Sequence, residues 1–256
     1  MSNVIYEPKG KALEYAPLAC NLYEGCGHGC LYCYAPDVLK KTRDEFARAK
    51  ARPDILSRIE KEAAKSNGSG PVLLCFTCDP YQPINAYDML TRDAIVILHK
   101  YGYRVNILTK AGTLAAGDFG FLSDKDFFGT TLTFADRQDS LHWEPNAADP
   151  INRMEAIREA HELGIPTWVS LEPVIDPQQT LDLIQLAAPF VDEFKVGKFN
   201  HVNPLPLSQQ DKDRVKEIDW WKFAHDTKDL LEKLGKKYYI KADLRHYLYT
   251  PTQGIW

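Results

Sequence analysis

Short apolar runs alternate with longer amphipathic stretches along the chain. Runs rich in β-branched residues and bounded by polar residues predict strands, whereas apolar positions three or four residues apart predict helices. The predicted strands cover residues 18–22, 72–77, 104–108, 128–134, 167–171, 193–196 and 238–240. The predicted helices cover residues 38–49, 55–66, 90–100, 150–163, 178–188 and 220–234. Such repetition is typical of a parallel sheet covered by helices, so we expect an α/β fold.

The helix predicted at residues 150–163 illustrates the amphipathic pattern. Its inward face is expected to carry Ile151, Met154, Ile157 and Leu163. The alternation of strands and helices continues through the 256 residues without a low-complexity linker. This length suits one large α/β domain with a substantial core, so we expect a single domain over residues 1–256.

Composition narrows the classes of function. No run of about 18 apolar residues occurs, which predicts neither a membrane span nor a secreted chain, so we expect a cytoplasmic protein. Six cysteines in a reducing compartment indicate metal or redox chemistry more than disulfides. The net charge of −4 does not support DNA as a partner, and acids are interleaved with the Lys and Arg residues of segment 211–245.

The most informative motif is a C-x3-C-x2-C loop formed by Cys26, Cys30 and Cys33. Thiolates are the usual ligands of iron-sulfur clusters, and three of them leave the fourth iron of a cubane open to bind a small molecule. Three glycines in this loop, at positions 25, 27 and 29, supply backbone angles that side chains forbid. The spacing therefore predicts an iron-sulfur centre with one open iron.

Zinc is the alternative interpretation of the same cysteines. One ligand set would add His28 to Cys26, Cys30 and Cys33, although two ligands one residue apart are cramped around tetrahedral zinc. Another would join Cys30 and Cys33 to Cys75 and Cys78. That second pair falls at the end of the strand predicted at 72–77, where residues three apart point to opposite faces, so we expect the two thiols not to share a metal.

Polar residues follow successive predicted strands. In a parallel α/β sheet the carboxyl ends of the strands meet at one rim, where catalytic groups collect. The residues expected at this rim are the Cys26 to Cys33 loop, Asp79, Lys110, Thr133, Glu172 and Lys198.

The motif Cys26-x3-Cys30-x-Tyr32-Cys33 resembles the signature of radical S-adenosylmethionine (SAM) enzymes. Further segments resemble the spore photoproduct lyase-like branch, and together the matches span about residues 21–173. These segments are residues 25–35, 77–83, 90–92, 108–110 and 144–145.

The resemblance implies a partial (β/α)6 TIM-type barrel, with a radical SAM core at about residues 16–200. A helix–strand extension at 201–256 would close the barrel. It also implies one [4Fe-4S] cluster, with SAM bound to the open iron through its amino and carboxylate groups. An external flavodoxin or ferredoxin would supply one electron, and SAM would then be cleaved to a 5′-deoxyadenosyl radical that abstracts hydrogen from a substrate not identified by the sequence.

Carried over by position, the resemblance assigns cofactor contacts to several rim residues. Asp79 would contact the polar groups of SAM, and Lys110 with a hydroxyl of Thr131 or Thr133 would bind its carboxylate. Tyr32 would pack beside the adenosyl group. Glu172 follows the fifth main strand, where such enzymes place groups that bind SAM or substrate.

The chain departs from the lyases at one position. They place a hydrogen-donating cysteine three residues before the strand-end aspartate, and Phe76 stands there in this chain. Cys75 and Cys78 flank it, and Cys78, next to Asp79, is the better candidate donor. Tyr32 and Tyr34 match the paired tyrosines of the lyases, so a radical relay through Tyr34 is also implied.

Three hypotheses follow. The first is a radical SAM enzyme of unidentified substrate. The second is lyase-like repair of thymine dimers in DNA, with Cys75 or Cys78 as hydrogen donor. The third is a zinc-stabilised module that binds nucleic acid or protein without catalysis.

Overall fold

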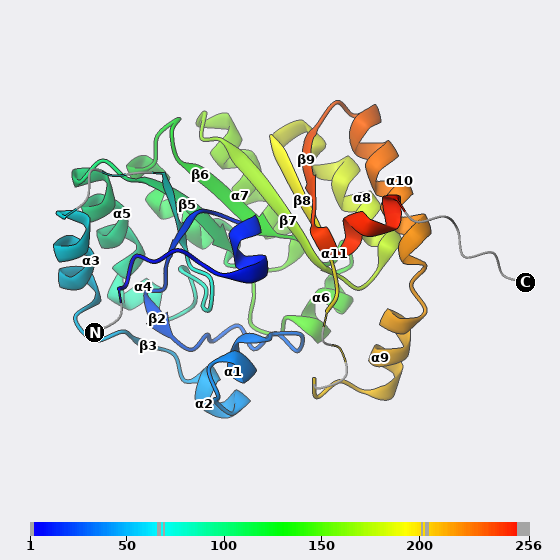
Figure 1. Ribbon diagram of the computed structural model, residues 1–256, viewed down its shortest axis with the longest axis horizontal. Helices are drawn as coiled ribbons and strands as arrows, with labels where there is room; N and C mark the ends of the chain where they lie inside the picture. Colours follow the sequence, from blue (N-terminus) through cyan, green and yellow to red (C-terminus); the bar gives the residue numbers. More distant parts are fainter. Residues whose placement is uncertain (1–2, 66–67, 69, 201, 203–204, 250–256) are drawn as a thin grey trace, which may run out of the picture.

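The computed structural model describes residues 3–65, 68, 70–200, 202 and 205–249. Its centre is a seven-stranded sheet in the order β1-β4-β5-β6-β7-β8-β9, in which each neighbouring pair is parallel (Figure 1). The strands are β1 (Leu18–Cys20), β4 (Pro71–Leu74), β5 (Arg104–Thr109), β6 (Phe127–Thr131), β7 (Thr167–Val174), β8 (Glu193–Lys198) and β9 (Lys237–Ile240). A small antiparallel pair is formed by β2 (Tyr23–Glu24) and β3 (Lys50–Ala51).

Helices connect the strands and cover the outer face of the sheet. The α-helices are α1 (Ala35–Val38), α2 (Arg43–Ala47), α3 (Ile55–Ala63), α4 (Asn85–Asp88), α5 (Leu90–Lys100), α6 (Arg137–Trp143), α7 (Pro150–Glu162), α8 (Pro177–Ala187), α9 (Gln209–Lys216), α10 (Trp220–Lys233) and α11 (Ala242–Arg245). The 3-10 helices are η1 (Gly10–Glu14), η2 (Gly112–Phe121), η3 (Ala188–Phe190) and η4 (His246–Leu248). None of the helices over the described ranges is long and apolar enough to cross a bilayer.

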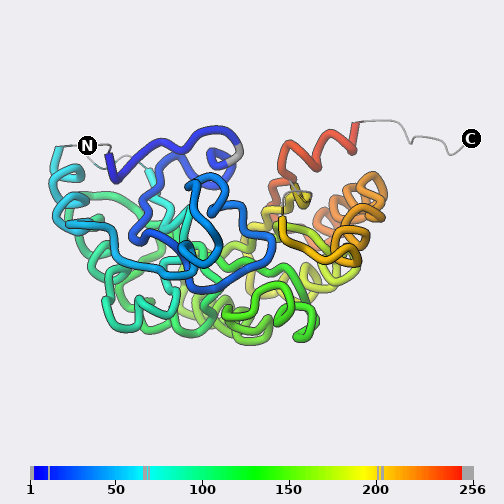
Figure 2. Tube along the Cα trace, turned by 90° about the horizontal axis from the view of Figure 1, so that it is seen from below, coloured from blue at the N-terminus to red at the C-terminus, as the bar shows by residue number. Residues whose placement is uncertain are grey.

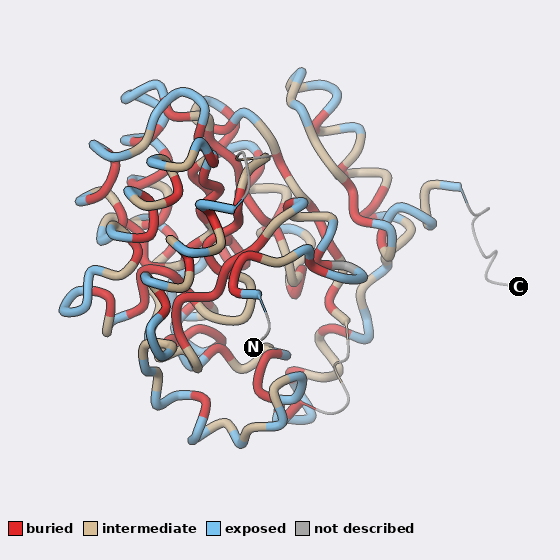
Figure 3. Tube along the Cα trace, turned by 60° about the vertical axis from the view of Figure 1, so that its left-hand side comes forward, coloured by how far each residue is buried: buried red, intermediate tan, exposed pale blue. Residues whose placement is uncertain are grey.

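Two apolar clusters lie on opposite faces of the sheet because side chains alternate along each strand. The larger cluster joins outward residues such as Ile107, Phe128 and Val169 to the covering helices. A smaller one lies on the concave face around Trp168 and includes residues of the N-terminal segment. Figure 3 shows buried segments running through the sheet and exposed ones on the outer turns of the helices.

The N-terminal segment lies across the concave face (Figure 1). Tyr6 forms an antiparallel bridge with Ala19 of β1, through N···O distances of 3.0 and 2.9 Å. Farther along, the Glu14 carboxylate accepts hydrogen bonds from the Tyr239 hydroxyl and the Ala242 amide. The segment therefore links β1 at one end of the strand order to β9 at the other.

The predicted α/β fold is confirmed, and most strands and helices lie where the pattern places them. The single helix predicted at 38–49 is wrong, because the chain forms α1 and then restarts as α2. Thr42 caps α2 by accepting from the Glu45 amide, while the Glu45 carboxylate accepts from the Thr42 amide. Lys40 between the two helices has a positive φ of 54°. Such a capping box marks a helix start, which an apolar pattern alone overlooks.

Smaller differences concern ends and faces. The strands predicted at 72–77 and 128–134 end earlier, at Leu74 and Thr131, and the helix predicted at 55–66 ends at Ala63. Residue 66 of that helix and residues 201, 203–204 and 250–256 of the predicted extension lie outside the described part of the chain. On α7, Ile151 and Leu163 are 69% and 60% exposed, so their predicted inward orientation is wrong. The buried face of α7 carries Arg153 together with Ile157.

Candidate functional site

The three cysteines of the C-x3-C-x2-C motif lie in the loop between β2 and α1. Their thiols are free, Cys30 is buried, and the Cys33 amide donates to the Cys30 carbonyl at 3.1 Å. Burial raises the pKa of Cys30 to about 12, and the nearby Lys110 ammonium opposes the shift only in part. A thiol of this kind stays protonated at neutral pH unless a metal displaces its proton. The loop thus holds three thiols whose ionisation depends on metal binding.

Helix α2 covers one side of this loop and contacts all three cysteines through their backbone. The Cys26 amide donates to the Phe46 carbonyl at 2.9 Å. The guanidinium of Arg43 donates to the carbonyls of Cys30 and Cys33, each at 3.1 Å. Gly25 allows this approach, because its φ is +88° and a Cβ there would lie 2.3 Å from the Phe46 carbonyl oxygen.

On its other side the loop is bound to two segments distant in sequence. Gln82 accepts from the Gly27 amide at 2.8 Å and donates to the Gly25 carbonyl at 3.2 Å. Asn146 donates its side-chain amide to the Gly27 carbonyl at 3.1 Å. The loop is therefore held in one conformation by the protein itself, before any ligand is considered.

His28 lies within the loop but faces away from a shared metal position. The residue is 3% exposed, its Nε2 lies 3.1 Å from Asp79 Oδ2, and its Nδ1 lies 3.0 Å from the Asn146 carbonyl. Both ring nitrogens are thus engaged by other groups. The zinc set that would use His28 as a ligand has no support in this geometry.

The second zinc set, which joins Cys30 and Cys33 to Cys75 and Cys78, has no support among the described residues either. Strand β4 ends at Leu74, so the strict alternation expected up to residue 77 does not apply to Cys75 and Cys78. The two thiols instead interact with each other, since burial and, after it, the neighbouring Cys78 raise the pKa of Cys75. The expectation that they point to opposite faces is wrong. In the described segments no three His, Cys, Asp or Glu side chains converge tightly enough to hold a single metal ion.

A cubane cluster makes a different demand, since each cysteine binds a different iron and the thiols need not converge on one point. Three thiols on one short, fixed loop satisfy this demand. The donor set therefore fits a cluster better than it fits a zinc ion.

Asp79 ties the cysteine loop to the end of β5. Its Oδ1 accepts from the Tyr81 amide at 2.8 Å and the Thr109 hydroxyl at 2.7 Å, and its Oδ2 accepts from the Lys110 amide at 2.7 Å and faces His28. Burial alone would raise the pKa of this carboxyl, but the His28 charge and the hydrogen bonds lower it to about 2. Both oxygens are thus engaged by protein donors, and the predicted contact of Asp79 with SAM stays a prediction.

Lys110 brings a half-buried positive charge to the same rim. Its Nζ lies 5.6 Å from the centroid of the Tyr32 ring and makes no hydrogen bond or ion pair with a described residue. Burial lowers the pKa of this ammonium, but Cys30, when its thiol is ionised, and the Glu144 carboxylate outweigh burial and the net shift is upward. Lys110 is therefore a cation beside the cysteine loop that is available to an anionic ligand.

The Glu144 carboxylate, which lies near Lys110, is bound by other groups. Arg153 Nη2 forms an ion pair with its Oε2 at 2.5 Å, and both side chains are at most 1% exposed. The Tyr32 hydroxyl donates to its Oε1, and the Thr133 hydroxyl lies 3.3 Å from the same oxygen. Arg153 also donates to the Thr131 carbonyl at 3.0 Å. Arg153 thus neutralises Glu144, and Glu144 fixes Tyr32 and Thr133.

Glu172 lies in a separate group on the concave face. The Tyr15 hydroxyl donates to its Oε2 at 2.5 Å, and Lys241 Nζ forms an ion pair with the same oxygen. Gly197 makes room for this pair, because a Cβ there would lie 2.8 Å from both the Glu172 carboxyl carbon and Lys241 Cδ. The structure therefore places Tyr32, Asp79, Lys110 and Thr133 near the cysteine loop, and it places Glu172 elsewhere.

Tyr34 lies between these two groups. Its ring packs on Phe76 at a centroid distance of 6.1 Å, Phe76 packs on Tyr15 at 5.9 Å, and the Tyr34 side chain is 42% exposed. Burial raises the pKa of its hydroxyl, and Cys33 and Glu172 add to the shift. The predicted relay residue is thus in aromatic contact with the Glu172 group.

Sequence reasoning missed the residues that support the loop. Gln82 and Glu144 occur inside the segments that carry the family resemblance, so a signal existed although it assigned them no role. Arg43, Asn146 and Arg153 carry no comparable signal. A buried arginine on α7 is predictable only when its carboxylate partner is known.

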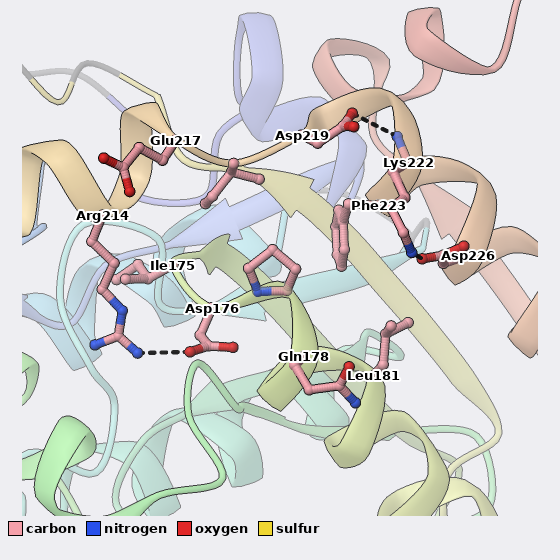
Figure 4. Close-up of a pocket in the computed structure, with 12 residues that line it drawn as sticks. Ile175, Asp176, Gln178, Leu181, Arg214, Glu217, Asp219, Lys222, Phe223 and Asp226 are labelled. Atoms are coloured by element: carbon pink, nitrogen blue, oxygen red, sulfur yellow. Dashed lines mark hydrogen bonds and ion pairs between the residues drawn. The ribbon is translucent and has the colours of Figure 1, made fainter.

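Surface cavities also occur among the described residues. One of about 380 Å³ lies among α8, α9 and α10, where Arg214 points at Asp176 and forms an ion pair at 2.7 Å (Figure 4). None of the site residues predicted from the sequence lines it. Another, of about 530 Å³, is lined by residues that include Tyr6, Arg52 and Thr77.

Comparisons with known proteins agree with this geometry. The family profile described as "Radical SAM superfamily" matches residues 20–188. An uncharacterised protein of Acidianus two-tailed virus, ORF301, is 27% identical over 247 residues, covering 86% of this chain and 77% of that protein. A second uncharacterised protein, MJ0683 of Methanocaldococcus jannaschii, is 25% identical and covers 62% and 61% of the two chains.

Solved structures share the fold. A spore photoproduct lyase complexed with dinucleoside spore photoproduct matches with a TM-score of 0.63 and 16% identity, over 93% of this chain and 79% of that one. SuiB of Streptococcus suis bound to S-adenosylmethionine matches with a TM-score of 0.64 and 13% identity, over 88% of this chain. This chain spans half the length of that SuiB chain.

Proposed function

The chain belongs to the radical SAM superfamily, and we propose that it cleaves SAM reductively and abstracts hydrogen from a substrate on the concave face of the sheet. The superfamily binds a [4Fe-4S] cluster and SAM, and it needs an external electron donor. When bound, this pair supplies a 5′-deoxyadenosyl radical. The residues of this chain have to hold the pair, orient the substrate and exclude water.

The observation that carries the proposal is the combination of three thiols on one fixed loop with the unpaired Lys110 ammonium beside it. Cys26, Cys30 and Cys33 are assigned as the cluster ligands. Lys110 is assigned to the carboxylate of SAM, because a half-buried cation without a described protein partner is stabilised by a charge-assisted hydrogen bond. Tyr32, held in place by Glu144, is assigned to the adenosyl group.

Other predicted residues take supporting roles in the proposal. Asp79 positions His28 in the loop and the backbone of Lys110. Thr133 shares Glu144 with Tyr32, and Thr131 holds Arg153 through its carbonyl. Glu172 is assigned to the substrate side, since its Oε2 is bound by Tyr15 and Lys241 while its side chain remains 18% exposed.

The first experiment is formation of 5′-deoxyadenosine by anaerobically reconstituted protein given SAM and dithionite. The variant Cys26→Ala/Cys30→Ala/Cys33→Ala should lose both the absorbance near 400 nm expected of a cluster and the product, whereas Cys20→Ala, a buried cysteine on β1, should retain both. Product in the triple variant would contradict the assignment. A wild-type protein with a full cluster that consumes no SAM with or without candidate substrates would contradict the function.

A second candidate, lyase-like repair of thymine dimers, is favoured by the Cys75 and Cys78 contact. Cys78 is the more exposed of the two, so it is the proposed hydrogen donor, with Tyr34 as the relay residue. If this candidate is correct, Cys78→Ala should convert ultraviolet-damaged DNA to side products of the unquenched radical instead of repaired thymines. Equal handling of damaged and undamaged DNA by the wild type would exclude this candidate.

A cytoplasmic location belongs to the same proposal. Six free thiols and a reduced cluster are compatible with a reducing compartment and are oxidised outside it. Recovery of the protein only from an oxidising compartment after cell fractionation would contradict the proposed location.

A further inference from the structure

The cavity of about 530 Å³ lies at the rim, between the segments that follow β1 and β4 and the N-terminal segment. Asn21 and Thr77 line it, and the Thr77 amide donates to Asn21 Oδ1 at 2.8 Å. Tyr6 lines it from the N-terminal segment, and its hydroxyl accepts from Asn21 Nδ2 at 2.8 Å. Figure 2, seen from below, shows the dark blue N-terminal segment beside the lighter blue segment that carries the cysteine loop. We call this space the rim cavity, and its volume suits a small organic ligand.

The charge around the rim cavity is positive. The charged side chains that line it are Arg52, Arg58, Lys9 and Glu7. Arg52 and Arg58 are half-buried, whereas Lys9 and Glu7 are exposed and oppose each other. Glu62, one turn after Arg58 on α3, is not among the described residues that line the cavity, and its carboxylate accepts from two backbone amides of the N-terminal segment at 2.8 and 2.9 Å. Three cations against one acid therefore surround the space, and the two that solvent screens least are arginines.

Arg52 is fixed next to β2 while the outer nitrogens of its guanidinium stay free. Its amide donates to the Leu22 carbonyl at 3.0 Å, and its Nε donates to the Tyr23 carbonyl at 3.2 Å. The two Nη groups have no partner among the described residues. A guanidinium held in this way presents a planar fork of N–H donors, which matches two oxygens of a phosphate group.

Thr77 adds an unsatisfied hydroxyl to the wall of the rim cavity. Its Oγ1 is buried and has no hydrogen-bond partner in the part of the chain that the structure describes. Buried hydroxyls are nearly always bonded, so a partner from outside the protein is expected. Because Thr77 lines the rim cavity, a ligand held there can supply that partner.

We propose that the rim cavity binds the phosphate group of a small organic phosphomonoester. Two phosphate oxygens accept from the Arg52 Nη groups, the third accepts from the Thr77 hydroxyl, and Arg58 adds a second positive charge. The organic part lies against the apolar side chains of Val4 and Leu39, which also line the cavity. A dianion with three terminal oxygens fits two arginines and a hydroxyl better than a carboxylate does. The inference goes beyond the proposed function, because neither the cluster nor SAM takes part in this binding.

The test measures the Kd for phenyl phosphate by calorimetry on the reconstituted holoenzyme. Phenol lacks the phosphate group and inorganic phosphate lacks the apolar group, so these two probes separate the contributions of the two parts. Arg52→Gln removes the fork and its charge, whereas Arg52→Lys retains the charge alone. Arg104→Gln is the matched control, because Arg104 is exposed at the start of β5 and is not among the lining residues.

Arg52→Gln should weaken phenyl phosphate binding at least about 10-fold through loss of charge-assisted hydrogen bonds, and Arg52→Lys should lose less. Thr77→Val, which removes the hydroxyl and keeps the shape, should weaken binding by about 3-fold. Arg104→Gln should change the Kd by less than about 2-fold, because an exposed charge at a distance is screened. Wild type should bind phenol and inorganic phosphate each more weakly than phenyl phosphate, and Arg52→Gln should leave the affinity for phenol unchanged.

Absence of phenyl phosphate binding by wild type, or equal losses in Arg52→Gln and Arg104→Gln, would overturn the proposal. Phenol or inorganic phosphate that binds as tightly as phenyl phosphate would overturn the ligand class. If circular dichroism shows that Arg52→Gln does not fold, Arg52→Lys and Thr77→Val decide, and an unchanged Kd in both overturns the proposal.

Lys110 is the other cation at the rim that an anion could choose, so the titration is repeated with saturating SAM. The Kd for phenyl phosphate should stay within about 2-fold, because binding at two separate sites is weakly coupled. Competition between SAM and phenyl phosphate would place the phosphate at Lys110 and overturn the proposal. A wild type that binds phenyl phosphate but no SAM would contradict the proposed function instead.

Discussion

Two lysines on this fold, the half-buried Lys110 and the buried Lys241, each lie beside a tyrosine ring and near a glutamate, and they differ in how their charge is balanced. Lys110 lies beside Tyr32 and Glu144 at the rim, and Lys241 lies 3.5 Å from the Tyr15 ring and pairs with Glu172 on the concave face. At the rim, Arg153 occupies the carboxylate and leaves Lys110 unpaired. The additional charge of Arg153 therefore distinguishes the two places. It leaves Lys110 free for an anionic ligand, whereas Lys241 is already neutralised by Glu172.

The pKa directions follow the same difference. Burial lowers the pKa of both ammonium groups, and for Lys241 the attraction of Glu172 does not overcome burial, so the net shift is downward. For Lys110 the Glu144 carboxylate and Cys30, when its thiol is ionised, overcome burial, and the net shift is upward. The rim holds its lysine charged without a direct partner, which is the state that an incoming carboxylate requires.

The largest expected effect comes from removing Arg153. Arg153→Met leaves Glu144 buried without its ion-pair partner and should lower the free energy of unfolding by about 3–5 kcal/mol. Denaturant unfolding of the metal-free protein measures this change. The double variant Glu144→Leu/Arg153→Met should recover most of the loss, because it removes both buried charges. If Arg153→Met were as stable as wild type, Lys110 could replace Arg153 as the partner of Glu144. The difference between an unpaired Lys110 and a paired Lys241 would then not hold.

Lys110→Met should have the next largest effect, which is a loss of affinity for SAM. Loss of a buried charge-assisted contact should weaken SAM binding by about 100-fold, which corresponds to about 2.7 kcal/mol. Equilibrium dialysis of the reconstituted protein measures the Kd for SAM. Lys241→Met is the matched control and should change that Kd by less than about 3-fold. Similar losses in both variants would show that the two lysines are not functionally distinct.

Asp79 should produce a pH-dependent effect of about 2 kcal/mol, since its carboxyl has a folded pKa of about 2 against a reference value of 3.8. Because the folded pKa is the lower one, its stabilisation is present above about pH 4 and is lost as pH falls towards 2. Metal-free wild type should lose stability in this window, and Asp79→Asn should show a flatter slope. Equal slopes of stability against pH in the two proteins would show that groups other than Asp79 cause the acid sensitivity.

The sequence predicts the repeating part of the molecule well. Strand periodicity places all seven strands of the main sheet within a few residues, because buried parallel strands leave short, continuous apolar runs. The cysteine motif likewise locates the loop, since its ligands are adjacent in sequence.

What the sequence does not predict is long-range charge balance. Periodicity placed Ile151 inward on α7, whereas the buried position belongs to Arg153 because Glu144, from the segment after α6, needs a cation. The proximity of Cys75 and Cys78 was not predicted for a similar reason. The predicted strand extended to residue 77, whereas β4 ends at Leu74, so the alternation of side chains does not apply to these two cysteines. Both errors arise where tertiary contacts override a local pattern.

The smallest expected effect tests the closed side of the comparison. Tyr15→Phe removes one donor to Glu172 while Lys241 still neutralises the carboxylate, so stability should fall by only about 1 kcal/mol. Affinity for SAM should not change, because Tyr15 contacts Glu172 and not the Lys110 group. Thermal unfolding and the Kd for SAM check both statements. A clear loss of SAM affinity in Tyr15→Phe would mean that the concave group and the rim act as one site, since Lys110 would then depend on a contact made by the N-terminal segment.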